Sequence, residues 1–329
     1  MNKIFSKSKI IIASLITMFL GFGALLVGNT FGSWVFNTSD NANANADVAV
    51  GDFDFGIKFS DPGFYDKDGN QTCGTDVKGN PIYWYDTDWA GKPSYNNGEL
   101  VPIFKTSCAD LSDSTSPVTI TGVKVDWDAE DYKSFVFPTY YVVKVNGKLI
   151  THTITTLGSG SKICDSYSPS CTTFTIPSTV TKISNYAFYN QGVAMTVLGG
   201  ENVTYYGNGC FCGDKMTSFP FSSKTEYIGS NAFYDNAFAS DIDLSATPLK
   251  TLGGRCFAEM KNPSTVSIDL PSSLASIGIG IAVTSKNNII INIDKTEAEI
   301  NAMITAGTCS QRWIKDWTYN HVTVNYKAA

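Results

Sequence analysis

One short phrase recurs five times between Phe174 and Val283, and it constrains the fold of this chain more than any other feature. The clearest copy is TFTIPSTVTKISNYAF, at residues 173–188. An apolar residue near the end of each copy sets the register, in steps of 23, 22, 24 and 25 residues: Ile183, Tyr206, Ile228, Leu252 and Ile277. A period in the low twenties is typical of leucine-rich-repeat solenoids, so the phrase predicts a mainly β protein of stacked short strands and turns.

Each copy of the phrase has an inner and an outer side. Phe174 and Ile176 alternate with Thr173 and Thr175, which predicts a strand with one buried face. Four copies place a glycine after the register residue, where we expect a turn with a positive φ angle: Gly207, Gly229, Gly253 and Gly278. A phenylalanine then closes most turns, at Phe188, Phe211, Phe233 and Phe257. One copy cannot bury its inner side alone, but stacked copies can.

The strings TIPSTVTKISNYAF and LPSSLASIG resemble the consensus of the BspA-like leucine-rich repeat family, over a little under half of the chain. The resemblance implies a bacterial or protist cell-surface protein, often adhesive, and it carries no catalytic residue. The segment that begins at Phe137 resembles the family's opening unit, with a type I′ hairpin expected at Asn146-Gly147 and a further register position at Leu157. The chain departs from the consensus at Gly199-Gly200 and at Ile281-Ala282.

The N-terminal region has the pattern of an export segment. Lys3, Lys7 and Lys9 precede an apolar run, so residues 1–28 are interpreted as a cytoplasmic basic stretch followed by a signal peptide or a membrane anchor. The pattern leaves open whether this segment is cleaved, and it places the body of the chain outside the cell. Residues 28–57 resemble the opening segment of TasA-like and camelysin-like secreted proteins, and residues 29–46 read as a linker.

Three further regions are expected after the linker. Residues 47–135 alternate in places and predict a small β-rich N-terminal domain, and residues 136–293 hold the repeats. Residues 294–329 are expected to cap the open end of the repeats. Thr296 and Glu299 have capping-box spacing, so a helix is expected from there to about Ala306, with Gly307 ending it and a last strand at residues 321–326.

Nothing in the composition points to catalysis or to nucleic acid. The net charge is −6, and the chain has two histidines, His152 and His321, far apart in the sequence and each read as an ordinary strand residue. We therefore expect no enzyme activity, no cofactor and no nucleic-acid partner. The segment Asp66–Asn70 has acids at alternate positions but lacks the glycine and the acid that an EF-hand loop needs. A plain turn is favoured over a calcium site, and no metal is expected.

The eight cysteines permit disulfides in an exported chain. Cys210 and Cys256 take the place of alanines two copies apart, so they are predicted to be buried thiols too distant to bridge. Cys164 is predicted to pair with Cys171, and Cys73 is a candidate partner for Cys108.

Two surfaces are candidates for binding an extracellular protein or glycan. The first is a column of outward-facing residues that becomes acidic toward the C-terminus: Thr175, Leu198, Pro220, Asp243 and Asp269. The second is the aromatic cluster of Tyr83, Trp84 and Trp89, whose rings either stack on sugars or form a small core. The favoured function is non-enzymatic adhesion by a surface or secreted protein. The alternative is a structural component of an extracellular matrix that assembles with copies of itself.

Overall fold

The computed structural model describes residues 63–70, 74–75, 81–82, 94–96, 99–101, 103–124, 134–164, 172–261, 265–283, 288–315 and 322–328. The chain divides into two compact units, Met1–Phe55 and Gly56–Ala329, and all the described residues belong to the second. Strands dominate this unit, and α2 (Glu297–Thr305) is the single helix among the described residues. The mainly β fold expected from the repeated phrase is confirmed.

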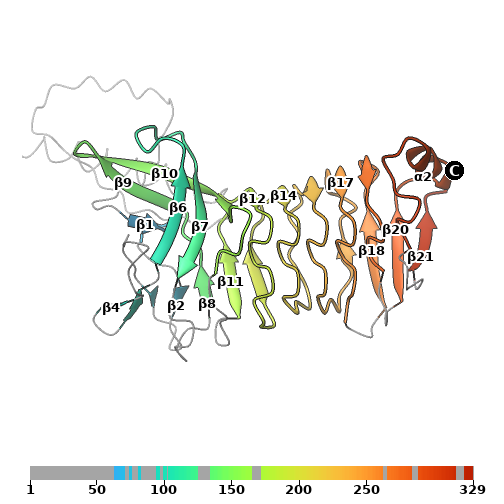
Figure 1. Ribbon diagram of the computed structural model, residues 1–329, viewed down its shortest axis with the longest axis horizontal. Coiled ribbons are helices and arrows are strands. Elements are labelled where there is room, and N and C mark those ends of the chain that lie inside the picture. Colours follow the sequence, from blue (N-terminus) through green and yellow to red (C-terminus); the bar gives the residue numbers. More distant parts are fainter. Residues whose placement is uncertain are drawn as a thin grey trace, which may run out of the picture. The chain divides into compact units, whose positions relative to one another are not determined.

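A ladder of two-residue parallel strands confirms the predicted register (Figure 1). The register residues face one another in every pair, from Ile183 against Tyr206 to Leu252 against Ile277. Leu157 extends the ladder at one end by pairing with Ile183, and Cys309 extends it at the other by bridging to Ile277. The strands are β10 (Lys148–Leu157), β12 (Lys182–Ile183), β14 (Tyr205–Tyr206), β15 (Tyr227–Ile228), β17 (Thr251–Leu252) and β19 (Ser276–Ile277).

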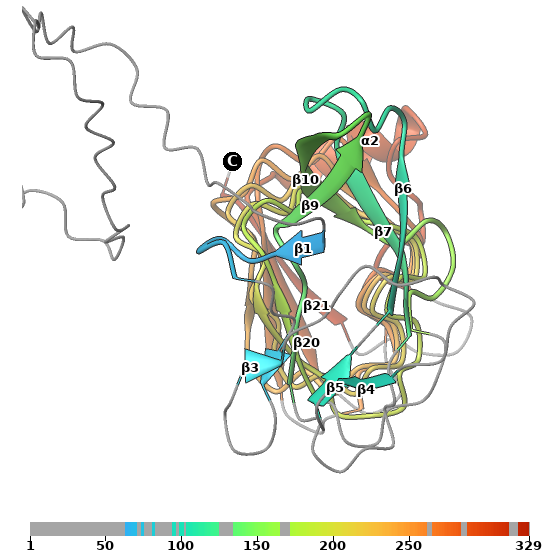
Figure 2. The ribbon, with the colours of Figure 1, turned by 90° about the vertical axis from the view of Figure 1, so that its left-hand side faces the viewer.

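A second set of strands lies across the core from this ladder. Figure 2 looks along the repeats and shows β20 and β21 on one side and β6 and β7 on the other. One sheet contains β13 (Thr196–Gly199), β11 (Thr173–Ile176), β8 (Ser134–Val136), β2 (Gly74–Thr75) and β3 (Pro81–Ile82). The other contains β16 (Ile242–Asp243), β18 (Val266–Leu270), β20 (Ile289–Ile293) and β21 (Val322–Tyr326).

These two sheets do not join, which corrects the expectation of one continuous outward column. Thr175 pairs with Leu198, and Asp243 pairs with Asp269, as the register predicts. Between them the third copy reads Phe219-Pro220-Phe221 and forms no strand. Proline has no N–H to give to a sheet, so the ladder is interrupted at Pro220 although its neighbours still pack against the core.

Strands from the N-terminal part of this unit pair directly with the repeat strands. β7 (Val118–Lys124) pairs in parallel with β10, and β8 pairs in parallel with β11. The hairpin of β9 (Tyr140–Val145) and β10 turns at Asn146 and Gly147, whose φ angles of 50° and 81° confirm the expected type I′ turn. The remaining strands are β1 (Gly63–Tyr65), β4 (Ser94–Asn96), β5 (Glu99–Val101) and β6 (Ile103–Cys108). The domain limits at residues 46 and 135 stay a prediction.

A column of stacked phenylalanine rings fills the core of the repeats. Phe188, Phe211, Phe233 and Phe257 are all fully buried. Successive ring centroids lie 4.9, 5.6 and 5.6 Å apart, with interplanar angles of 2°, 15° and 18°. The predicted inward position of the phenylalanines is therefore confirmed, and each ring contacts the next copy as well as its own.

The glycines after the register residues allow close stacking of successive turns, and the predicted positive φ angles at these positions are wrong. Gly207, Gly229, Gly253 and Gly278 do not have positive φ angles. They are small because successive turns stack closely: a Cβ on Gly253 would lie 2.3 Å from the backbone of Gly229. The positive φ angles occur two residues later in the turn, at Tyr186, Gly209, Asn231, Arg255 and Gly280.

The C-terminal part ends the repeats as expected. The Thr296 hydroxyl accepts the Glu299 N–H at 3.2 Å, and the Glu299 carboxylate accepts the Thr296 N–H at 2.7 Å, which confirms the capping box. Ala306 caps the other end of α2, and Gly307 follows with a φ angle of 76°. Ile300, Cys309 and Trp313 are buried against the last repeat.

The cysteine predictions have a mixed outcome. Cys210 and Cys256 are free and fully buried, as expected. Cys108 is also free, so the candidate bridge from Cys73 to Cys108 is wrong in this structure. Cys171 lies outside the described residues, and the predicted bridge from Cys164 to Cys171 stays a prediction. Cys164 is buried in the core and bridges through its backbone to Val123, which makes it a packing residue.

Candidate binding face

One face of the repeat ladder carries an in-register row of polar side chains. Each row residue directly precedes a register residue in its strand and therefore points to the opposite side of the sheet. In the repeats the row is Lys182, Tyr205, Tyr227, Thr251 and Ser276. It continues across the neighbouring strands β10, β7 and β6 through Thr156, Thr119 and Ser107. We call these eight residues the hydroxyl row, because seven of them carry a hydroxyl group.

The two tyrosines of the row stack on each other at the surface. The ring centroids of Tyr205 and Tyr227 lie 4.4 Å apart with an interplanar angle of 4°. The Lys182 ammonium lies 5.1 Å from the centroid of Tyr205, within range of a cation–π interaction. Partial burial raises the pKa of Tyr205, and the charge of and a hydrogen bond with the neighbouring Tyr227 raise it further, so its hydroxyl stays protonated at neutral pH.

A pocket of about 420 Å³ opens beside this tyrosine pair. Its hydroxyl groups come from Ser107, Thr119, Thr121, Thr156, Ser159 and Ser184. The Tyr205 ring and the Asn185 side chain complete the wall, and Lys182 is the only charged side chain among the described residues that line it. The volume is within the usual range of small-molecule sites, and the lining is more polar than is usual for them.

The repeats also hold the pocket wall rigid. The Asn185 side-chain oxygen accepts the Asn208 backbone N–H at 2.8 Å, and the Asn208 side-chain oxygen accepts the Ser230 N–H at 2.8 Å. This repeated contact fixes the amide of Asn185 from one copy to the next. Its Nδ2 group has no protein partner among the described residues and is free to donate to a ligand.

The predicted acidic column is already engaged within the protein. The Asp243 carboxylate accepts the backbone N–H of Ser245 at 2.9 Å and its hydroxyl at 2.6 Å. The Asp269 carboxylate accepts the Asn292 amide at 2.5 Å, and Asn292 in turn accepts the Asn325 amide at 2.8 Å. Beyond Asp269 the column thus continues with the asparagine side chains of Asn292 and Asn325, not with acidic residues. A binding role for Thr175, Asp243 and Asp269 stays a prediction.

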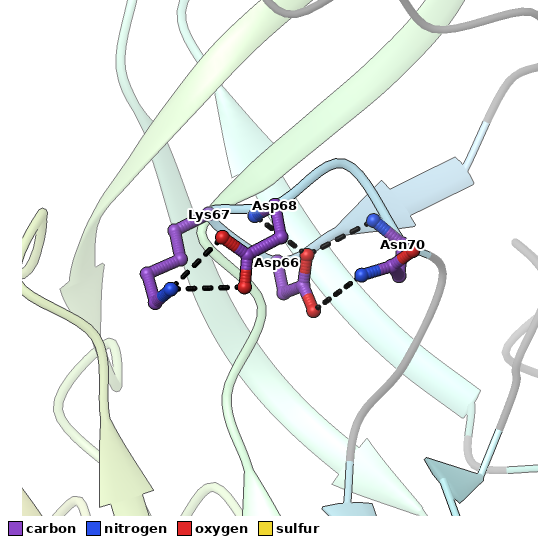
Figure 3. A network of polar contacts seen from close by, with 4 residues as sticks. All are labelled: Asp66, Lys67, Asp68 and Asn70. Atoms are coloured by element: carbon purple, nitrogen blue, oxygen red, sulfur yellow. Dashed lines mark hydrogen bonds and ion pairs between the residues drawn. The ribbon is translucent and has the colours of Figure 1, made fainter. Parts of the chain in front are cut away.

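Two other candidate sites have structural explanations where the structure describes them. The Asp66 carboxylate accepts the backbone N–H groups of Asp68 at 2.8 Å and Asn70 at 2.9 Å (Figure 3), which is the geometry of a plain turn. His152 is fully buried in β10, where its ring nitrogens lie 2.9 Å from the Ser116 carbonyl and 3.2 Å from the Leu111 carbonyl. The His152 ring therefore anchors the loop between β6 and β7 through these two carbonyl groups. Tyr83, Trp84, Trp89 and His321 lie outside the described residues.

The hydroxyl row was not among the predicted sites, although the sequence contains a signal for it. The predicted outward column follows the longer strand of each copy, whereas the row consists of the residue before each register position. Reading that residue in every copy gives Lys, Tyr, Tyr, Thr and Ser. Ser107 and Thr119 had no such signal, because their strands lie outside the repeated phrase.

The stacked ladders, the phenylalanine column and the partly exposed polar row are the architecture of a leucine-rich-repeat region. Residues 161–300 match the family described as BspA type Leucine rich repeat region, in six copies. Proteins with this type of repeat are usually bacterial surface or secreted proteins and are typically binding proteins without enzyme activity.

One solved structure is similar to part of the chain, a leucine-rich repeat protein from Bacteroides ovatus ATCC 8483. It is 17% identical, with a TM-score of 0.36, over 59% of this chain and 60% of that protein. The chain thus matches about 60% of that protein's length. No curated protein matches the chain at a significant level. Across the part of the chain that the structure describes, no helix has the length and apolar character to cross a membrane.

Proposed function

We propose that the protein is a non-enzymatic binding protein of the bacterial surface or extracellular space, and that the hydroxyl row is its binding face. The stacked pair of Tyr205 and Tyr227 carries the proposal. Two aromatic rings held side by side on a regular sheet form a rigid, amphipathic contact surface, and ordering them costs little further entropy on binding. The pocket and Lys182 extend this surface toward β10 and β7.

An array of extracellular matrix proteins and glycans, probed with the purified full chain, tests this proposal. We expect binding that is lost in a variant with Tyr205→Ser and Tyr227→Ser. Leu111→Ser is the control, because Leu111 is 39% exposed and belongs to neither the hydroxyl row nor the predicted outward column. If the double variant, still folded, keeps the affinity of the wild type, the binding face lies elsewhere.

The surface location is the second part of the proposal. It rests on the basic and apolar segment at residues 1–28 and on the usual location of proteins with BspA-type repeats. Protease added to intact cells should digest the repeats, with a cytoplasmic protein as the control for lysis. Full protection of the repeats in unlysed cells would contradict it.

Self-assembly into a matrix is the alternative function, and one feature of the fold favours it. β21 pairs on one side only within the described chain, with β20, so its other edge is open to another strand. Light scattering across a range of concentrations separates the two functions. Growth of particles with concentration would favour assembly, whereas a constant mass would favour adhesion.

A further inference from the structure

We infer that the pocket beside Tyr205 binds a saccharide that carries a carboxylate group. This inference rests on the proposed function, because it names the ligand class for the same face. Three features of the lining lead to it: a row of hydroxyl groups, one aromatic ring and one cation.

The hydroxyl groups indicate a ligand with many hydroxyls of its own. Six serine and threonine side chains line the pocket, and a hydroxyl group can donate one hydrogen bond and accept two, although that of Thr121 already donates to the Lys105 carbonyl at 3.2 Å. A sugar ring offers the same mixture of donors and acceptors around its edge. An apolar ligand would leave these groups without partners, at a cost that grows as water is excluded.

The tyrosine ring supplies a rigid aromatic edge to the pocket, because its two faces are covered by Tyr227 and by the Lys182 ammonium. Tyr205 is held between Tyr227, at 4.4 Å, and the Lys182 ammonium, at 5.1 Å, so its orientation is fixed before the ligand arrives. The hydroxyl of Tyr205 is protonated at neutral pH, and its hydrogen bond with Tyr227 further fixes the ring. A fixed ring keeps the entropy cost of binding low.

Lys182 gives the pocket its preference for a negative charge. It makes no ion pair with an acid among the described residues, and no described acid lines the pocket. Lys250 offers a contrast three copies later, where its ammonium is paired with Glu226 at 3.1 Å. A carboxylate on the sugar would accept a charge-assisted hydrogen bond from the Lys182 ammonium. Uronic acids and sialic acids both supply such a group, and the experiment tells them apart.

Calorimetric titration of the purified full chain tests the inference with three probes. These are a tetrasaccharide of glucuronic acid and N-acetylglucosamine, sialyllactose, and neutral lactose. We expect at least one of the two charged probes to bind, and whichever binds identifies the source of the carboxylate. Lactose should bind at least about tenfold more weakly, because the charged contact is worth more than one decade in affinity. Added salt should weaken the charged probe further.

Two lysine variants locate the contact. Lys182→Gln should weaken the charged probe at least about tenfold and leave lactose unchanged. Lys250→Gln, at an exposed lysine that does not line the pocket and is already paired with Glu226, should leave both unchanged. Circular dichroism of each variant confirms that the repeats remain folded. Equal losses in the two variants would overturn the assignment of the charge to Lys182.

The outcomes separate this inference from the proposed function. If neither charged probe binds, or lactose binds equally well, the inference is wrong. If the array still returns a partner that depends on Tyr205 and Tyr227, the proposed function stands without it. If the charged probe binds and is weakened by Lys182→Gln alone, both stand. If no probe binds and no array partner depends on the tyrosines, both fail.

Discussion

Replacing Asp214 with asparagine is expected to stabilise the protein at neutral pH. Asp214 is fully buried, and its Oδ1 accepts the Gln191 backbone N–H at 2.8 Å. Its Oδ2 has no hydrogen-bond partner among the described residues. Burial is the largest effect and raises the pKa of Asp214 well above its usual value, while the Gln191 N–H and Lys162 lower it by less.

The next copy has an asparagine at the position equivalent to Asp214. Asn236 occupies the equivalent place, where its amide nitrogen donates to the carbonyls of Phe211 at 2.8 Å and Phe233 at 3.0 Å. A carboxylate has no N–H to donate in such a turn, whereas an asparagine at position 214 would. The gain should be about 1–3 kcal/mol, the cost of leaving one buried polar group unsatisfied.

The dependence on pH distinguishes this explanation from a general packing effect. The pKa of Asp214 is higher in the folded state than in the unfolded state, so folding takes up a proton between the two values. The stability of the wild type should therefore fall as pH rises through that window, by at most about 1.4 kcal/mol per pH unit. The variant lacks this loss, so its advantage should shrink toward zero below about pH 4, where the aspartate is neutral in both states.

Urea unfolding of the full chain between about pH 4 and about pH 8, followed by tryptophan fluorescence, measures both effects. Asp243→Asn is the control, because the Asp243 side chain is exposed and its hydrogen bonds from Ser245 lower its pKa. The contribution of Asp243 to stability depends on pH in the opposite direction to that of Asp214. It is present above the pKa of the unfolded state and is lost as the pH falls. If Asp214→Asn gains nothing at neutral pH, or keeps the pH dependence of the wild type, the reasoning is wrong.

Three further predictions test the repeats themselves. Phe233→Ala should lower the free energy of unfolding in urea by about 3–5 kcal/mol, because it removes a ring from the stacked column. Thr175→Ala, on the outer side of its strand, should change it by no more than about 0.5 kcal/mol. Equal costs would refute the inward and outward assignment. Gly253→Ala should cost about 1–3 kcal/mol, because its Cβ would overlap the backbone of Gly229, and unchanged stability would show that the turns stack more loosely. Cys210 and Cys256 should resist alkylation until the chain unfolds, since burial raises the pKa of both thiols; a native bridge between them would contradict the register.

The fold of the repeats was predictable because the same pattern of inward-facing residues recurs in every copy. The residues from Ile183 to Ile277 each had to occupy the same inward position, and five copies make a chance register improbable. The glycine error arose because the sequence shows that a side chain is missing but not why. Positive φ and close stacking both favour glycine, and only the 2.3 Å approach to Gly229 separates them.

The pairing of the N-terminal strands with the repeats could not be predicted from the sequence. Paired residues of β7 and β10, such as Ile120 and Leu157, are 37 positions apart (157 − 120), with no repeated spacing to reveal the pairing. The pocket depends on that pairing, since Ser107, Thr119 and Thr121 come from β6 and β7. The site therefore combines a predictable half, Lys182 and Tyr205, with a half that appears only when the chain is folded.

The composition of the hydroxyl row has two explanations that the fold helps to separate. Threonine and tyrosine both favour strands, so part of the row is consistent with local strand preference alone. Lys182 and the serines are not favoured in this way, and no core contact requires a hydroxyl at a position that faces away from the core. The inward neighbours vary among isoleucine, tyrosine and leucine, which keeps the core filled while the outward residue is free to change. The hydroxyls that strand preference leaves unexplained are at Ser107 and Ser276, and the first of these lines the pocket.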